Sequence, residues 1–190
     1  MSGGEFHVHG PHDHHVEHEG QHGDKFANRV AVMTAIFATI GAFLGYLGGA
    51  TQNDALLYKN EAAIKTTKSA DQWAFYQGKS NKQNLAELGA ALSAGETAAK
   101  FTAEVARYKK EKDEIKAAAE KLEAEARVSE EKSAAALHVH HRYAQAMTLI
   151  QVAIALSAIT ILTRSRGLMA IAYGAAGAAI IVGILAAAHI

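Results

Sequence analysis

The residues best suited to chemistry are histidines that gather near the start of the chain. They are His7, His9, His12, His14, His15, His18 and His22. Imidazoles with neighbouring carboxylates suit Zn²⁺, Ni²⁺ or Cu²⁺, and ligands two to four residues apart can close on one ion in a flexible chain. Residues 1–24 are polar without apolar periodicity, so we expect them to be disordered unless something binds them. This leader is a metal-binding segment, a solvated tail, or a pH sensor whose imidazoles charge together.

A second histidine group, His138, His140 and His141, lies in the run LHVHHRY. His138 and His141 share one face of a helix, whereas His140 points elsewhere. Polar residues at a membrane interface, beside an aromatic and basic belt, explain this group better than a metal site does.

Charge is segregated along the chain. The 190 residues include 19 Lys and Arg, 19 Asp and Glu, and no Cys. Zero net charge argues against a nucleic-acid partner, and the absence of Cys excludes disulfides and thiolate chemistry. Residues 30–50, 143–163 and 167–188 contain no charge, and each run is long enough to cross a bilayer. These runs are typical of a membrane protein.

The sequence predicts an all-α membrane protein with three transmembrane helices and a long antiparallel coiled-coil hairpin between the first and second. We place the transmembrane helices at 25–50, 143–163 and 167–189, and the hairpin stalk at 51–142 with a break near 89–95. We prefer a retained anchor to a cleaved signal peptide for the first span, because the preceding segment is long and acidic. At the break, Gly89 is a plausible helix end, and Ser93 with Glu96 forms a capping box.

A seven-residue repeat marks the second arm of the hairpin. Phe101, Tyr108, Ile115 and Leu122 recur every seven residues along an uninterrupted charged helix. This spacing predicts a coiled-coil seam that faces the other arm or a neighbouring copy. The pairs Glu96–Lys100 and Glu123–Arg127 have the spacing of favourable ion pairs on a helix.

Small residues form ladders on the first and third spans. Gly41, Gly45 and Gly49 lie on one face of the first, and Gly174 and Gly183 belong to Ala/Gly ladders on the third. Such ladders let membrane helices approach closely, either within one chain or between copies. Three thin spans that carry a long stalk with an exposed seam favour a homo-oligomer. The apolar runs 30–50, 143–163 and 167–188 contain no charged residue, which argues against an ion-coupled transporter but leaves open a pore between copies, with Gln151 at its axis.

Basic residues beside the spans predict the orientation. Lys25 and Arg29 precede the first span, and Arg164 and Arg166 lie in the short loop after the second. Both sets are expected on the cytoplasmic side, which places the N-terminus inside and both the hairpin and the C-terminus outside, in the periplasm.

The chain also resembles a known family. The leader HVHGPHDHHVEH, from His7 to His18, and the segment LLYKNEAAIKTTKSADQWAFYQGKS, from Leu56 to Ser80, are similar to the bacterial membrane proteins of the DUF4337 family. The resemblance extends over essentially the whole chain. It implies an inner-membrane protein with a helical middle, and it supplies no catalytic residues.

We therefore expect a structural or scaffolding protein of the bacterial inner membrane, whose partners are the lipid bilayer and further copies of itself. An enzyme is not expected, since a two-helix hairpin offers no cleft for catalytic groups. The alternatives are a metal-handling membrane protein that binds Zn, Ni or Cu through its leader, and a pore formed between copies.

Overall fold

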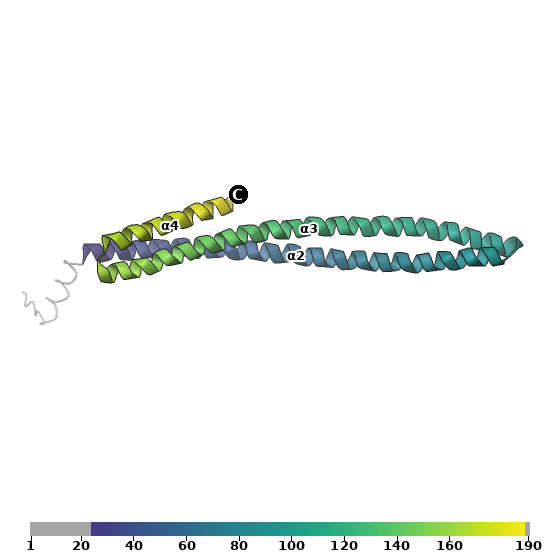
Figure 1. The fold of residues 1–190 in the computed structure, drawn as a ribbon, viewed down its shortest axis with the longest axis horizontal. Coiled ribbons are helices and arrows are strands. Elements are labelled where there is room, and N and C mark those ends of the chain that lie inside the picture. The colour runs from purple at the N-terminus through teal and green to yellow at the C-terminus, as the bar shows by residue number, and fades with distance from the viewer. Residues whose placement is uncertain (1–23, 189–190) are drawn as a thin grey trace, which may run out of the picture. The chain divides into compact units, whose positions relative to one another are not determined.

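The computed structural model describes residues 24–188, which form three long helices. They are α2 (Lys25–Leu92), α3 (Gly95–Thr163) and α4 (Arg166–Ala187), as Figure 1 shows. The expectation of an all-helical protein is confirmed, and each helix is long and apolar enough to cross a membrane. The seven histidines of the predicted leader lie outside the described residues.

The described residues divide into two compact units. Residues 24–49 and 139–188 form a three-helix unit, made of the start of α2, the end of α3 and all of α4. Residues 50–138 form a two-helix unit, made of the other parts of α2 and α3.

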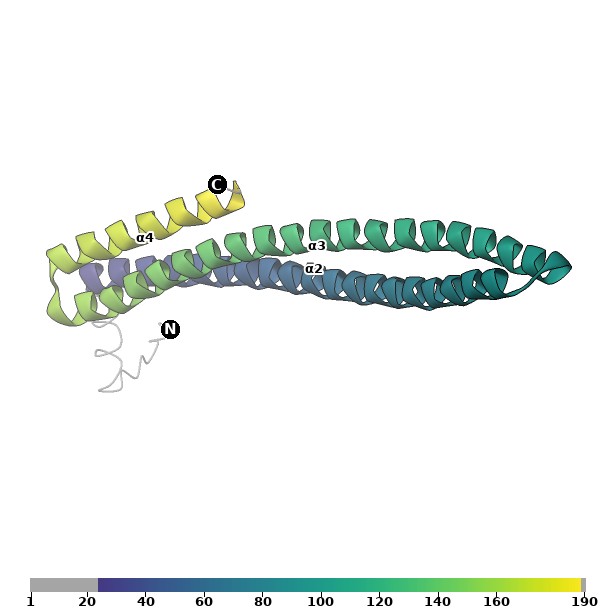
Figure 2. The same ribbon diagram turned by 45° about the vertical axis from the view of Figure 1, so that its right-hand side comes forward.

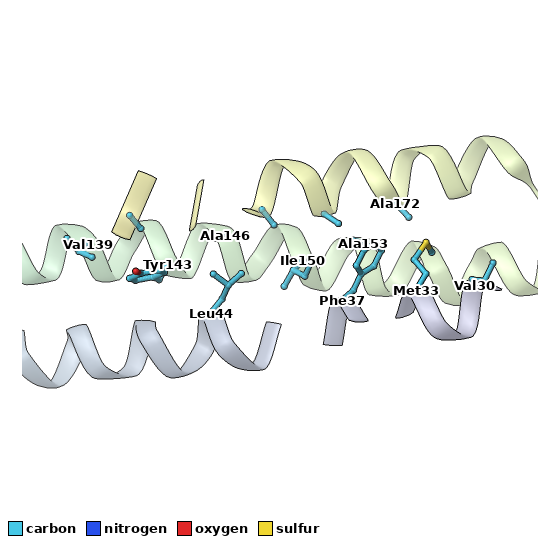
Figure 3. Close-up of a cluster of buried hydrophobic side chains, with 13 residues drawn as sticks. Val30, Met33, Phe37, Leu44, Val139, Tyr143, Ala146, Ile150, Ala153 and Ala172 are labelled. Atoms are coloured by element: carbon cyan, nitrogen blue, oxygen red, sulfur yellow. The ribbon is translucent and has the colours of Figure 1, made fainter. Parts of the chain in front are cut away.

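The core of the three-helix unit joins large side chains of α2 and α3 to small ones of α4. Phe37 and Leu44 of α2 lie among Tyr143 and Ile150 of α3 (Figure 3). The buried residues of α4 are all small, namely Ala172, Ala176, Ala179, Gly183 and Ala186. Small side chains let the α4 backbone approach the other two helices closely, which is how helices pack in a membrane.

One end of the three-helix unit is closed by polar contacts. Asp24 Oδ1 accepts a hydrogen bond from the backbone N–H of Phe26 at 3.1 Å and so caps the start of α2. Asp24 Oδ2 also lies 2.5 Å from the guanidinium of Arg164, in the turn between α3 and α4. Ser165 caps the start of α4. The beginning of α2 and the α3–α4 turn therefore lie at the same end of this unit (Figure 2).

In the two-helix unit α2 and α3 run antiparallel, side by side in both views (Figures 1 and 2), and the chain reverses through Ser93 and Ala94. Gly95 has a φ of +63°, a conformation that glycine adopts without strain. The sequence expectation for Gly89 was wrong, because α2 continues past it to Leu92. A Cβ on Gly89 would lie 2.9 Å from Cε1 of Phe101, so this glycine makes room for the ring instead of ending the helix.

Small side chains fill most of the interface between the two arms. They recur at intervals of seven: Ala55, Ala62 and Ser69 on α2, with Ala119, Ala126 and Ser133 on α3. Close approach lets side chains reach the opposite backbone, since Ser133 Oγ donates to the carbonyl oxygen of Ala55 at 2.8 Å. Ile115 is the one buried large apolar side chain among residues 50–138. The two arms therefore bury little apolar surface between them.

Candidate self-association interface

The three glycines of the α2 ladder differ in their surroundings, since Gly41 and Gly45 pack against α3 and Gly49 does not. A Cβ on Gly41 would lie 3.2 Å from Cγ2 of Ile150, and one on Gly45 would lie 3.3 Å from Cε of Met147. Both glycines thus serve the packing of α2 against α3 within the chain. Nothing lies within 4 Å of the corresponding position on Gly49, which stays open.

The two glycines predicted on the third span also differ. A Cβ on Gly183 would lie 2.8 Å from Cδ2 of Leu44, so Gly183 sits directly against α2. Gly174 is exposed and has nothing within 4 Å of that position. Of these two glycines, only Gly174 faces open space.

The predicted seam on α3 faces the other arm of the same chain. Ile115 is buried, and Phe101, Tyr108 and Leu122 are half-buried. The ring of Tyr108 lies 5.6 Å from Nζ of Lys79 on α2. Because these side chains are used inside the hairpin, a contact between copies must use other residues.

A polar layer crosses the middle of the hairpin. Trp73 Nε1 donates to Oε1 of Glu123 at 2.7 Å, and Ser69 Oγ donates to the same oxygen at 3.4 Å. The expected pair of Glu123 with Arg127 is absent from residues 24–188, because the carboxylate has turned toward Trp73 instead. The expected pair of Glu96 with Lys100 forms at 2.9 Å. Beside this layer lies an open groove of about 400 Å³.

Ion pairs on the hairpin shift the pKa of Glu111, Glu61 and Lys65. Lys79 Nζ lies 2.5 Å from Oε2 of Glu111 and lowers the pKa of that carboxyl by hydrogen bonding. Lys65 Nζ lies 2.8 Å from Oε1 of Glu61. This contact lowers the pKa of Glu61 and raises that of Lys65. Glu111, Glu61 and Lys65 are therefore charged near neutral pH.

One surface of the hairpin is nearly free of charge. We define the α2 outer face as the exposed residues that point away from α3: 56, 57, 60, 63, 64, 67, 70, 71, 74, 77, 78, 81, 84, 85, 88, 91 and 92. Large apolar side chains recur on it at multiples of seven residues, namely Leu57, Ile64, Leu85 and Leu92. Leu85 is 67% exposed and Leu92 is 79% exposed. Asp71 is the only charged residue on this face.

The corresponding surface of α3 has the opposite character. Its exposed outward residues include Lys100, Arg107, Lys110, Asp113, Glu114, Glu120, Lys121, Arg127 and Glu131. Dense mixed charge is typical of a helix face that meets water. An exposed apolar stripe outside the uncharged runs is typical of an interaction surface. The α2 outer face is therefore the candidate contact surface of the hairpin. The seven-residue repeat of α3 gives no indication of this surface, because it lies on the other helix.

Within the three-helix unit, Gln151 is an exposed polar residue at mid-span. It lies on α3 near the centre of the uncharged run 143–163. Thr148 and Ser157, on the same helix, donate to carbonyl oxygens four residues back at 2.9 and 2.8 Å. The amide of Gln151 makes no hydrogen bond among residues 24–188.

The second histidine group does not form a cluster of ligands. His140 Nδ1 lies 2.8 Å from the carbonyl oxygen of Gly48, so this nitrogen carries the hydrogen that the carbonyl accepts. His138 and His141 are exposed. Within residues 24–188, no three His, Asp or Glu side chains gather in a way that could hold a metal ion. The predicted ligands in the leader lie outside the described residues.

Comparison with known proteins identifies a family for this chain. Residues 26–189 match the family model described as a domain of unknown function, DUF4337. No curated protein and no solved structure matches the sequence. Since the family match covers nearly the whole chain, the protein belongs to the DUF4337 family.

Proposed function

We propose that this protein is a structural, self-associating component of the bacterial inner membrane, and the observation that carries the proposal is Gln151. Its amide is exposed at mid-span and has no hydrogen-bond partner among the described residues. A polar group left unpaired in hydrocarbon costs on the order of several kcal/mol. A second copy removes this cost, because two glutamine amides can each donate to and accept from the other.

The α2 outer face supports self-association outside the hydrocarbon. Copies anchored in one membrane with one orientation are parallel, so each residue of this face can meet its own equivalent. Leu57, Ile64, Leu85 and Leu92 are then in register with themselves. The thin interior of the hairpin adds to the argument, since two helices with little apolar burial gain stability from added partners.

The seven-residue burial period on both arms favours coiled-coil geometry for the hairpin. A repeat of seven keeps the same stripe facing the partner helix only when the helices wind around each other. In this proposal α2 and α3 of one chain form the coiled coil, and the α2 outer face joins it to further copies.

The proposed orientation places the end that carries Asp24 and Arg164 in the cytoplasm. Lys25, Arg29, Arg164 and Arg166 flank the spans there, and basic residues beside short loops remain on the cytoplasmic side. A chain without Cys makes this testable, because single cysteines can be labelled with an impermeant maleimide in intact spheroplasts. We expect labelling of Ala117→Cys in the hairpin but not of Ser165→Cys in the turn, and the reverse pattern would invert the orientation.

The mass of the detergent-solubilised protein tests the role of Gln151. We expect an oligomer for the parent chain and a smaller assembly for Gln151→Leu. A leucine side chain has no hydrogen-bonding group that needs a partner in lipid. Gln145→Leu is the matched control, since Gln145 is exposed on the same helix near the end of the span. A monomeric parent would overturn the proposal, and an unchanged mass for Gln151→Leu would remove Gln151 from the interface.

Disulfide cross-linking tests the α2 outer face independently. Ile64→Cys and Leu85→Cys should each give a dimer on mild oxidation in native membranes. Ala117→Cys on the charged face of α3 should stay monomeric. Equal cross-linking at residue 117, or none at residues 64 and 85, would exclude this face as the contact between copies.

A further inference from the structure

A groove on the three-helix unit joins a basic end to an apolar floor. It has a volume of about 430 Å³ and is lined by α2 and by Tyr173 of α4. Asn28 and Arg29 line it at the start of α2, and Ile36 and Phe37 line it further along. The rings of Phe37 and Tyr173 meet edge to face, with centroids 5.9 Å apart. The groove therefore has a polar mouth and an aromatic floor.

Two polar groups on this groove have no partner within residues 24–188. Arg29 is exposed, and no carboxylate of the described chain lies within ion-pair distance of it. Tyr173 is 48% exposed, and its hydroxyl makes no hydrogen bond there. Arg29 and Phe37 are eight residues apart, which is about 12 Å along a helix. The groove thus has the guanidinium of Arg29 at its mouth and the hydroxyl-bearing ring of Tyr173 beside its aromatic floor.

The charge around the mouth favours an anion. Lys25, Arg164 and Arg166 lie at the same end of the three-helix unit as Arg29, and Asp24 is the only acid there among the described residues. The carboxylate of Asp24 is already paired with the guanidinium of Arg164. Basic grooves between membrane helices are suited to the head groups of anionic lipids.

We propose that this groove binds one anionic phospholipid. The lipid phosphate lies at Arg29 and Asn28, and one acyl chain follows Ile36 and Phe37. The Tyr173 hydroxyl donates to an ester carbonyl of the lipid. A second copy is a poorer occupant of this groove, because a parallel copy seated in it would place its own basic end directly beside Arg29, and Asp24, the only acid there among the described residues, is already paired with Arg164.

Native mass spectrometry of the delipidated full-length protein tests this site. The protein is titrated with phosphatidylglycerol, and separately with phosphatidylcholine that carries the same acyl chains. One basic residue near a membrane surface favours an anionic lipid by about fivefold. We expect the parent to retain phosphatidylglycerol by about that factor, and Arg29→Gln to retain the two lipids equally. Arg166→Gln is the matched control, since Arg166 lies at the same end but does not line the groove, and it should keep the preference.

Further arms separate the lipid from other occupants. Tyr173→Phe removes only the hydroxyl, which donates to an ester carbonyl that both lipids carry. This variant should therefore retain both lipids less well. Orthophosphate should not displace the bound lipid, since the acyl chain contributes most of the contact. The proposal would be overturned if the parent retained the two lipids equally, or if orthophosphate displaced the bound lipid. It would also be overturned if Arg166→Gln lost the preference for phosphatidylglycerol as fully as Arg29→Gln. A change in oligomer mass for Arg29→Gln without a change in lipid retention would overturn it too, because that result would assign the groove to another copy.

Discussion

Leu44 on α2 lies so close to Gly183 on α4 that a Cβ on residue 183 would stand 2.8 Å from Cδ2 of the leucine. Leu44 is itself buried. The side chain of one helix therefore occupies the space that a glycine leaves on another, and α4 is held by this fit. Sequence spacing alone gave Gly174 and Gly183 the same role, whereas the structure separates them.

Gly183→Val should destabilise the protein, because the new side chain competes with Leu44 for a filled space. Overpacking of this kind costs about 1–3 kcal/mol. Gly174→Val adds the same atoms at an open position, so its thermal midpoint in detergent should stay close to that of the parent. Equal midpoints for the two variants would contradict the close packing of Gly183 against Leu44.

The same contrast exists on α2 between Gly45 and Gly49. Gly45→Leu places a large side chain against Met147 and should force α2 and α3 apart. We expect poor accumulation of this variant, or a smaller and less stable assembly. Gly49→Leu has open space around it and should accumulate normally. If Gly45→Leu matches the parent in mass and thermal stability, the glycine is not needed for the packing of the two helices.

The sequence located three segments that are long and apolar enough to cross a membrane, and the region in which α2 and α3 are joined. Runs without charge and a sustained period are strong signals, because each rests on many residues at once. The end of α2 was less predictable. Gly89 has the residue type of a helix end, and only the ring of Phe101 shows that close packing is the reason for the glycine. A contact between residues far apart in the chain leaves no local signal.

The candidate interface was harder to predict for the same reason. The repeat on α3 was visible, but a repeat does not say whether its partner is the other arm or another copy. Glu123 illustrates the limit, since the i,i+4 rule favours Arg127 while the indole of Trp73 lies 2.7 Å away on the opposite helix. The sequence does contain one signal for the α2 outer face, the recurrence of Leu57, Ile64, Leu85 and Leu92. It indicates an interface between copies only when α3 is known to pack against the opposite face of α2.

Ile115→Asp should weaken the hairpin severely. Ile115 is 8% exposed and is the largest buried apolar side chain between the two arms. A carboxylate there has no basic partner prepared for it, at a cost of about 3 kcal/mol. Ala117→Asp changes an exposed position two residues away and is the control. Circular dichroism during heating should show an earlier loss of helix for Ile115→Asp only, and a normal melt would remove Ile115 from the core.

Acid should weaken the hairpin through Glu111 and Glu61. The pKa of each carboxyl is lowered from 4.5 by its lysine partner. The stability that each pair contributes is therefore present above the ordinary pKa, and it is lost as the pH falls through the lowered pKa. Between about pH 6 and about pH 3, the thermal midpoint of Glu111→Gln should fall less than that of the parent. Glu114→Gln, at an exposed position without an ion pair in the described chain, should behave like the parent, and an equal acid sensitivity of all three proteins would contradict the role of the Lys79–Glu111 pair.

Deletion of residues 7–22 should abolish the binding of Zn²⁺ or Ni²⁺ while leaving the assembly intact. Residues 7–22 hold seven of the eleven histidines, and closely spaced imidazoles beside carboxylates suit a transition-metal ion. The histidines of the second group are less suited, because His140 is engaged with Gly48 while His138 and His141 lie on a helix. Only neutral imidazole binds a metal, so affinity should fall between about pH 7 and about pH 5. Calorimetry on both chains at both pH values checks this, and equal uptake without residues 7–22 would leave the leader as a solvated tail and direct attention to His138 and His141.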